Sequence, residues 1–312
     1  MSKQTENGRA FEWAVGMALK EQTRFEIELN QFAVNAREAF SGIPIKKQKT
    51  FASAAKLAVT HILNKESQFL RSGTDGVIRF NTEKAGTEGD VRDLLLTVNQ
   101  KTLGISCKNN HKALKHSRLS ASLNFIKKWG IDSSGCSESY MSQMRVLFGE
   151  LRKIKKDSNG TFLWDNLENK AERFYWPILD AWANELKRIC EISSEKQAVL
   201  CREIISYIVG RYDFYKVVCE GTKKVNIQAW NFNNTLATKR TKYPDCINAI
   251  NNKNGGQYSK TLVFNHGYSI NFRIHNASSR VEPSLKFDIN AIGLPTEVYQ
   301  QTLDLPSIPL SD

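Results

Sequence analysis

The chain has 312 residues, of which 41% are hydrophobic and 24% charged, so it has the composition of a globular protein and the length for one large α/β domain or two smaller ones. Its formal net charge of +12 favours a polyanionic partner such as nucleic acid, and the lack of an amphipathic basic anchor makes a membrane surface the weaker alternative. No apolar run reaches about 18 residues, which excludes a transmembrane helix, and the N-terminal residues lack the apolar centre of a secretory signal, so we expect a cytoplasmic protein.

Residues 8–21 are predicted to form an amphipathic helix. Glu12 fits this helix badly, because Val15 and Leu19 at i+3 and i+7 place its carboxylate on the apolar face. An isolated buried charge is very costly, so this carboxylate must be paired, hydrogen-bonded or linked to a metal ion. The sequence leaves open an ordinary ion pair with a neighbouring Arg or Lys.

Two further helices are expected over residues 29–40 and 48–70, and a short strand over residues 77–80. They lead into a β-hairpin over residues 89–108, in which the four polar residues 99–102 join the strands. The first strand is a short apolar run, and the second alternates between apolar and small or polar side chains. The hairpin carries the candidate catalytic residues.

Acidic side chains stand at the start of the first strand of this hairpin, and a lysine lies on the second. Asp90 and Asp93 precede the apolar run, and alternation places Ser106 and Lys108 on one face of the second strand. Carboxylates beside a lysine stabilise a sheet poorly, but they can hold a divalent metal next to a polarised water. Asp93 directly abuts the apolar run and Asp90 is farther from Ser106, and the sequence leaves open which of the two is the metal ligand.

A polar, basic loop is expected directly after the second strand. Residues 111–120 include two histidines, two lysines, an arginine and two serines, which suit contact with phosphate. A solvated surface loop could have the same composition, but the position after the candidate catalytic strand favours DNA contact. The candidates for DNA contact here are His111, Lys115, His116, Ser117 and Arg118.

The second half of the chain changes from helices to strands near residue 211. Long helices are expected over residues 165–190 and 195–210, whereas residues 125–156 show a less regular pattern with a basic run at its end. Residues 231–257 are rich in Asn, Lys, Thr and Gly and are expected to form a loop. Five strands are expected, over residues 214–218, 225–230, 261–264, 268–274 and 285–289.

These patterns predict two portions of the chain. Residues 1–210 would form a helix-rich portion that contains the candidate catalytic hairpin 89–108, and residues 211–312 a strand-rich portion for DNA recognition. Because no linker rich in Pro, Gly or Ser separates them, we expect the two portions to pack as one continuous globule.

An acid at the start of one strand and a hydrophobic-Xaa-Lys sequence on the next resemble the core of the PD-(D/E)xK nucleases. The resemblance implies an α/β fold with a mixed central sheet flanked by helices, an acid on each of the two strands for Mg²⁺, and a lysine that orients or activates the attacking water. The sequence departs from this pattern at Ser106, a weaker ligand in the place of the second acid. The group often carries a glutamate on an early helix, so Glu12 is a candidate to replace that acid.

Several longer blocks resemble the HaeIII family of type II restriction endonucleases and together extend from residue 8 to about residue 295. These blocks are Gly8–Glu12, Gly89–Asp93, Ile105–His111, Lys115–Leu119, Tyr212–Val217, Phe272–Ser278 and Glu282–Asp288. The resemblance implies Mg²⁺-dependent cleavage of double-stranded DNA at the palindrome GGCC with blunt ends, and a partner cytosine methyltransferase that protects host sites. Together with the motif it points to Lys108, Asp90, Asp93, Ser106 and Glu12 as catalytic residues, with Asp90, Asp93 and Glu12 as the metal ligands.

The implied target favours side chains that can read G·C base pairs. Arg and Lys donate to guanine O6 and N7, and Asp and Glu accept from cytosine N4. The segment from residue 273 to 286 offers such donors, although a structural β-hairpin with exposed polar residues is the alternative. The candidates for DNA contact here are Arg273, His275, Asn276, Arg280 and Lys286. A palindromic target also favours a two-fold homodimer.

Two other functions remain as alternatives. A PD-(D/E)xK nuclease of DNA repair type would cut branched or damaged DNA without preference for a palindrome. A non-catalytic DNA-binding protein could retain the fold, since Ser106 weakens the metal site.

Overall fold

A computed structural model describes residues 3–70, 75–82, 90–110, 115–252 and 258–306. Contacts between Cα atoms divide the chain into two compact units, each built from separate segments. Unit 1 comprises Met1–Lys112, Gly210–Lys242 and Thr296–Asp312, and unit 2 comprises Ala113–Val209 and Tyr243–Pro295. The chain passes from unit 2 to unit 1 between residues 209 and 210, which coincides with the expected change from helices to strands. The strand-rich part of the chain is nevertheless shared between both units.

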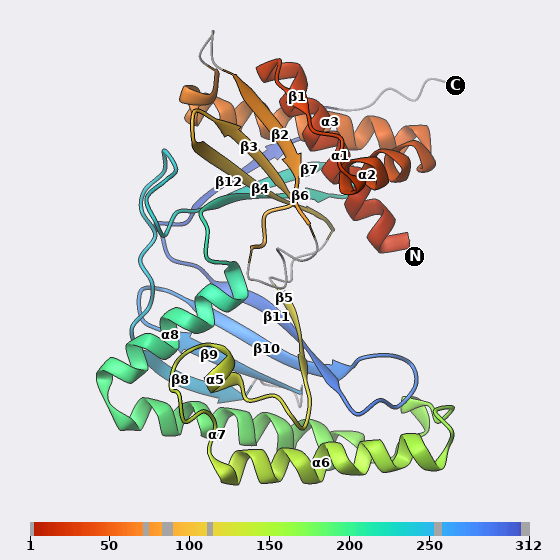
Figure 1. The fold of residues 1–312 in the computed structure, drawn as a ribbon, viewed down its shortest axis with the longest axis vertical. Coiled ribbons are helices and arrows are strands. Elements are labelled where there is room, and N and C mark those ends of the chain that lie inside the picture. The colour runs from red at the N-terminus through yellow and green to blue at the C-terminus, as the bar shows by residue number, and fades with distance from the viewer. Residues whose placement is uncertain (1–2, 71–74, 83–89, 111–114, 253–257, 307–312) are drawn as a thin grey trace. The chain divides into compact units, whose positions relative to one another are not determined.

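Unit 1 is a seven-stranded mixed sheet with helices packed against it (Figure 1). Its strand order is β1-β2-β3-β4-β6-β7-β12, with β1 parallel to β2 and β4 parallel to β6. The strands are β1 (Glu26–Ile27), β2 (Gly76–Phe80), β3 (Leu94–Val98), β4 (Lys101–Asn109), β6 (Phe214–Glu220), β7 (Lys224–Trp230) and β12 (Tyr299–Asp304). The helices are α1 (Lys3–Thr23), α2 (Gln31–Gly42), α3 (Ile45–Lys65) and the short 3-10 helix η1 (Ser67–Leu70).

The core of unit 1 determines which face of the sheet carries Ser106 and Lys108. One buried cluster joins the apolar side chains of α1 and α3 to alternate residues of the strands, among them Ile105 and Cys107 on β4 and Val217 on β6. Because successive side chains of a strand point to opposite faces, Ser106 and Lys108 lie on the other face of the sheet.

Unit 2 is an antiparallel sheet in the order β5-β11-β10-β9-β8 with helices packed on one face. The ring of Trp182 lies 4.7 Å from that of Phe272 and 5.1 Å from that of Phe287, which attaches α7 to β10 and β11. The strands are β5 (Lys115–Leu119), β8 (Ile247–Asn252), β9 (Ser259–Phe264), β10 (Ser269–Asn276) and β11 (Leu285–Gly293). The helices are α5 (Phe125–Lys128), α6 (Glu138–Asp157), the 3-10 helix η2 (Trp164–Asn166), the π-helix η3 (Ala171–Tyr175), α7 (Trp176–Ile192) and α8 (Ser194–Val209).

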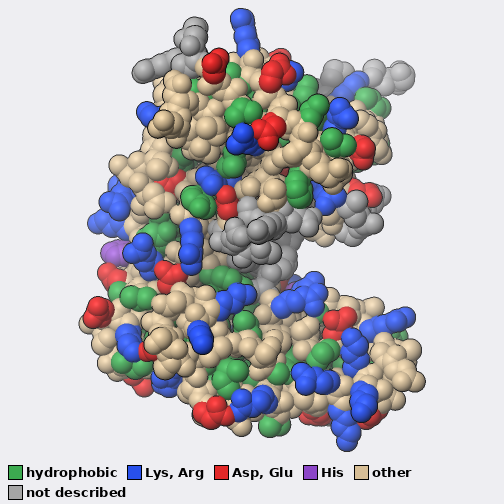
Figure 2. Space-filling view, viewed as in Figure 1, with side chains coloured by type: hydrophobic (Ala, Val, Ile, Leu, Met, Phe, Trp, Pro, Cys, Tyr) green, Lys and Arg blue, Asp and Glu red, His purple; other side chains and the backbone are tan. Residues whose placement is uncertain are grey.

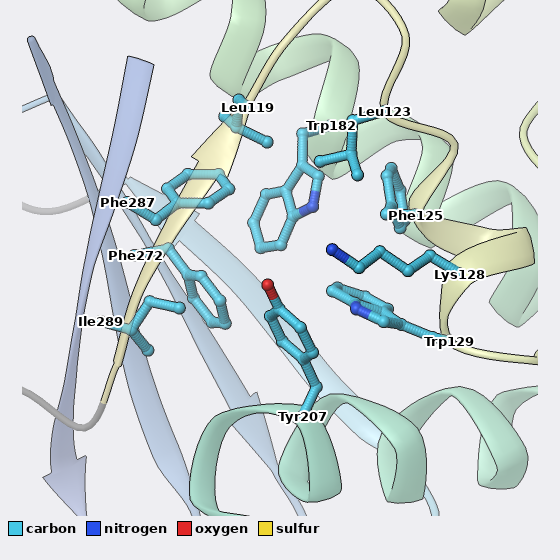
Figure 3. Close-up of a pocket in the computed structure, with 10 residues that line it drawn as sticks. All are labelled: Leu119, Leu123, Phe125, Lys128, Trp129, Trp182, Tyr207, Phe272, Phe287 and Ile289. Atoms are coloured by element: carbon cyan, nitrogen blue, oxygen red, sulfur yellow. The ribbon is translucent and has the colours of Figure 1, made fainter. Parts of the chain in front are cut away.

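A small cavity lies inside the aromatic core of unit 2, between the sheet and the helices. Figure 3 shows Trp182, Phe272 and Phe287 on one side and Trp129 and Tyr207 on the other. The cavity holds about 20 Å³, room for about one water, and its lining is largely apolar. It is therefore a packing void of this core.

The predicted mixed α/β class is confirmed, and the strands concentrate toward the C-terminus. The hairpin of β3 and β4 is confirmed, but the predicted four-residue turn is wrong, since Lys101 and Thr102 already belong to β4. Asn99 and Gln100 form the turn alone, with φ of 47° and 67°. Positive φ at both central residues is the geometry of the tight turn that matches the twist of a hairpin.

Other expectations for single segments were wrong. Residues 125–156, expected to be irregular, contain most of helix α6, which Ser137 caps by accepting a hydrogen bond from the backbone N of Tyr140. The basic loop after β4 contains β5, and the loop over residues 231–257 contains β8. Both strands lie at the edges of the sheet in unit 2 and pair with one strand each, β5 with the distant strand β11 and β8 with the next strand in the chain, β9. Within the described residues, no helix has both the length and the apolar character needed to cross a membrane.

Candidate active site

Asp93 is fixed by its backbone at the start of β3. Its backbone N donates to the carbonyl O of Ile105 (2.9 Å), and its own carbonyl O accepts from the backbone N of Asn81 (2.9 Å). These two bonds extend the pairing of β3 by one residue toward β4 on one side and toward the end of β2 on the other. The carboxylate of Asp93 is therefore held beside the segment Ser106–Lys108.

Three donors from β4 converge on one oxygen of this carboxylate. Oδ2 of Asp93 accepts from Oγ of Ser106 (3.0 Å), from the backbone N of Cys107 (2.6 Å) and from Nζ of Lys108 (3.1 Å). Hydrogen bonds to an ionised group are stronger than neutral ones, so this arrangement fixes Asp93 and Lys108 together. Within the described part of the chain, Oδ1 of Asp93 accepts no hydrogen bond and stays available to a ligand.

Glu12 of α1 is the second carboxylate of this cluster. Burial and the negative charge of Asp93 raise its pKa to about 8, while the positive charges of Lys108 and Arg9 act in the opposite direction. Among the described residues, the Glu12 carboxylate accepts no hydrogen bond and makes no close ion pair. Glu12 therefore does not form the ordinary ion pair that the sequence left open with any described residue. Its carboxylate and that of Asp93 lie close enough to repel each other.

Lys108 keeps its proton in this cluster. Burial lowers the pKa of its ammonium, but the charge of Asp93 and the hydrogen bond to it outweigh that effect, so the pKa lies above the usual value. An ammonium donates hydrogen bonds and cannot take a proton from water. The geometry therefore suits Lys108 to orienting a water or a phosphate oxygen.

Asp90, the other candidate acid, lies in a different cluster. Both of its oxygens accept from the guanidinium of Arg92, at 2.8 and 2.7 Å. The same guanidinium lies 4.1 Å from the ring centre of Tyr212. The side chain of Arg92 also packs on Gly104, where an added Cβ would lie 2.1 Å from Cδ of Arg92. Asp90 is thus neutralised by a packed arginine and is far less available to a metal ion than Asp93.

Lys216 on β6 is a residue of this face that the sequence analysis did not single out. It lies in register with Ser106 across the parallel pair β4 and β6 and is only 6% exposed. Burial, and next to it the charge of Lys108, lowers its pKa to about 8. The signal available in the sequence was one lysine inside the otherwise apolar run of residues 214–218.

The candidates for DNA contact that are described lie in unit 2. Arg118, Lys286 and His275 are paired in a row across β5, β11 and β10, on the face opposite Trp182. Arg273 lies on the same face and binds Asp288 on β11, with NH2 2.8 Å from Oδ2. This face of the sheet is therefore polar and largely basic.

The remaining candidates are placed less favourably or not at all. The amide of Asn276 donates to the carbonyl O of Ser278, and Arg280 forms an isolated bridge with Leu163, so both belong to the connection between β10 and β11. His111 lies outside the described residues, as do the side chains of Lys115, His116 and Ser117.

The donor set of the cluster fits a hard divalent cation. Glu12 and Asp93 supply carboxylate oxygens, and Oδ1 of Asp93 accepts no bond from a described residue. No group of three or more His, Cys, Asp or Glu side chains suited to a metal ion occurs in the described part of the chain. Mg²⁺ needs no such group, because it is commonly held by one or two carboxylates together with water and substrate phosphates. Glu12 and Asp93 therefore match a magnesium site better than a zinc site.

An acid at the start of one strand, a lysine on the next strand that binds it, and a helical glutamate beside both match the arrangement that the resemblance to PD-(D/E)xK nucleases implies. The family model described as HaeIII restriction endonuclease matches residues 8–295. Over 318 aligned positions, the chain is 30% identical to the type II restriction enzyme HaeIII of Haemophilus aegyptius, with 95% of this chain and 96% of that protein covered. The chain belongs to the HaeIII restriction endonuclease family, so it is a site-specific deoxyribonuclease that acts on DNA.

Proposed function

We propose that this restriction endonuclease hydrolyses both strands of DNA with Mg²⁺ at the palindrome GGCC and leaves blunt ends. The observation that carries the cleavage site is the convergence of Ser106, Cys107 and Lys108 on one oxygen of Asp93, next to Glu12. The GGCC target and the blunt cut are supported by the similarity to the HaeIII enzyme over nearly the whole chain.

Glu12 and Asp93 would hold the metal ion, and the available Oδ1 of Asp93 gives it a ligand that costs no existing hydrogen bond. When bound, a divalent cation neutralises charge on the scissile phosphate and makes a bound water more acidic. Lys108, which keeps its proton, donates to the attacking water or to a phosphate oxygen and holds it in line with the bond that breaks. Ser106 and the backbone N of Cys107 keep the Asp93 carboxylate in one orientation.

The basic face of the sheet in unit 2 is our proposed recognition surface. Arg118, Arg273, His275 and Lys286 lie on it, and Arg273 is 52% exposed along its side chain. Arginine donates in a bidentate manner to guanine O6 and N7, which is the commonest base-specific contact for a target made of G·C pairs. Figure 2 shows further Lys and Arg side chains over the C-terminal end of α6, where the sequence has its basic run at residues 152–156, and we assign these to phosphate contact.

A palindromic target favours a two-fold symmetric homodimer, because each half-site then meets the same protein surface. An enzyme that cuts GGCC in its own cell also requires protection of the host sites, so we propose a cognate cytosine methyltransferase and a cytoplasmic location for both proteins.

Plasmid DNA with a few GGCC sites tests this function directly. With Mg²⁺ we expect discrete fragments with blunt ends, and none with a chelator or after methylation of the sites. Preference for branched DNA would instead indicate a repair nuclease, and DNA binding without cleavage would indicate a non-catalytic protein. Either of these results contradicts the proposal.

A further inference from the structure

A second buried lysine lies on the face of the sheet that carries the cleavage site. Lys216 on β6 is paired with Ser106 on β4, and directly paired residues of neighbouring strands point to the same face. Ser106 and Lys108 share that face as well, because they are two residues apart on one strand. On its other side Lys216 is paired with Gln228 on β7, so a polar row crosses three strands.

This lysine is buried without a partner. Within the described residues, Lys216 makes no hydrogen bond or ion pair, although it is only 6% exposed. The other buried charged side chains are satisfied: Glu66, Glu185, Asp213 and Lys260 each make at least two hydrogen bonds. A buried cation that lacks a partner costs stability, so this ammonium is well suited to bind an anion that enters the site.

The serine in the place of the second acid explains why Lys216 is unpaired. A carboxylate at position 106 would stand directly beside Lys216 on the neighbouring strand and would bind it. The hydroxyl of Ser106 donates to Asp93 instead and offers Lys216 no negative charge. The departure from the motif at Ser106 therefore leaves a second cation available on this face.

We propose that Lys216 is a phosphate-binding residue of the cleavage site, which contacts one phosphate of the bound DNA strand and positions it for cleavage. The inference rests on the proposed function, because the anion is a phosphate only if DNA enters this site. Lys108 and Lys216 then divide the work: Lys108 stays bound to Asp93, and Lys216 gains its first partner when the strand arrives.

The test measures binding of a GGCC duplex by Lys216→Met, with a chelator present so that the duplex is not cut. Each lost phosphate contact should weaken binding about tenfold and reduce the steepness of log K against log salt by about 0.9, and in a homodimer, which loses one contact per subunit, the slope should change by about 1.8. Lys224→Met is the matched control, since Lys224 is an exposed lysine on the adjacent strand β7 and should change neither value.

Duplexes that carry one neutral methylphosphonate at the same position of each strand identify the phosphate, because a palindrome presents the same phosphate to both subunits. At one position the parent should lose its advantage over Lys216→Met, and at all others the difference should persist. Equal affinity of the parent and Lys216→Met for the unmodified duplex would overturn the inference, as would a difference that no methylphosphonate removes.

Stability and cleavage measured on the same proteins separate the possible failures. Lys216→Met should unfold at the same temperature as the parent or at a higher one, because the variant no longer buries an unpaired charge. Every measurement is repeated on Lys216→Gln, which places a polar side chain at this position. Loss of the fold in both variants would mark a structural residue and overturn the inference. If the parent does not cut DNA with Mg²⁺, the proposed function itself fails. If the parent cuts DNA but Lys216→Met binds the duplex as tightly as the parent, only the role of Lys216 is contradicted.

Discussion

Ser106 stands where the nuclease motif has its second acid, and its hydroxyl serves as one of three donors to Asp93. Glu12 of α1 brings the second carboxylate to the cluster instead. We therefore predict that Ser106→Ala lowers the cleavage rate by about tenfold or less, the value of one hydrogen bond. Glu12→Gln should lower it by at least about a hundredfold, because it removes a proposed metal ligand. Single-turnover cleavage with Mg²⁺ measures both, and a larger loss for Ser106→Ala than for Glu12→Gln would contradict this assignment.

The raised pKa of Glu12 also makes the stability of the metal-free protein depend on pH. Its pKa is about 8 in the folded protein against 4.5 as the ordinary value, so between these values the folded state binds more protons than the unfolded chain. Stability should then fall as the pH rises from about 4.5 to about 8. Glu12→Gln removes this loss, so we predict that the variant matches the parent near pH 4.5 and becomes more stable than the parent above pH 8. Urea unfolding with a chelator checks this, and two parallel pH profiles would contradict it.

Single residues also show what a sequence can and cannot predict about the site. Alternation on β4 was sufficient to bring Ser106 and Lys108 to one face, and the misfit of Glu12 on an apolar helix face marked it as a special acid. The choice between Asp90 and Asp93 was not available from spacing, because it depends on Arg92, whose guanidinium binds Asp90. Lys216 was missed because its position beside Ser106 depends on pairing between strands about a hundred residues apart.

At the scale of elements, local patterns predicted those that are regular along their own sequence. Clear periodicity marks five elements, and each lies where the sequence predicts it: α1, α2, α3, β6 and β7. The edge strands β5 and β8 were read as loops because they are polar, and β5 also gains its structure from the distant strand β11. The segment before α7 was read as helix but forms 3-10 and π turns, which hydrophobic spacing does not distinguish from an α-helix.

The hairpin depends on one glycine on β4. A Cβ on Gly104 would lie 2.1 Å from Cδ of Arg92, so Gly104→Ala must displace the arginine that binds Asp90 at the start of β3. We predict a loss of about 1–3 kcal/mol in unfolding free energy from this overpacking. Gly149→Ala is the control: this glycine lies inside α6 with open space around its Cβ position, so alanine should stabilise the helix by about 1 kcal/mol. Urea unfolding measures both changes, and equal stability of the two variants would contradict the packing described for Arg92.

At the scale of the whole molecule, the net charge of +12 is consistent with DNA as the partner, and we propose that the basic residues of the two units have different tasks. Unit 1 contains the carboxylates and lysines of the proposed cleavage site. Unit 2 contains the basic sheet face with Arg118 and Arg273, and the basic end of α6. Sequence recognition and strand cleavage should therefore be separable by substitution.

Arg273→Ala tests this separation. If Arg273 reads a guanine, the variant should lose about 1–3 kcal/mol of discrimination between GGCC and sites with one changed base pair. Lys153→Ala, at the basic end of α6, should weaken binding to all sequences equally. Competition binding with matched and altered duplexes measures both effects. Thermal unfolding confirms that each variant folds, because Asp288 loses its ion pair in Arg273→Ala. Unchanged discrimination in Arg273→Ala would remove this residue from the recognition surface.

We propose that Asp93, and not Asp90, is the strand-borne metal ligand of the DNA-cleaving site. The most direct measurement is the single-turnover cleavage rate of a GGCC duplex with Mg²⁺ for Asp93→Asn and Asp90→Asn. Because Asp93 alone faces Lys108 and Glu12, we predict that Asp93→Asn cuts at least about a thousandfold more slowly than the parent while it still folds and binds DNA. Asp90→Asn should stay within about tenfold of the parent rate. It should mainly lower the stability, since the guanidinium of Arg92 then lacks the negative charge of its partner. Cleavage at the parent rate by Asp93→Asn, or a folded Asp90→Asn variant that does not cut, would contradict the claim.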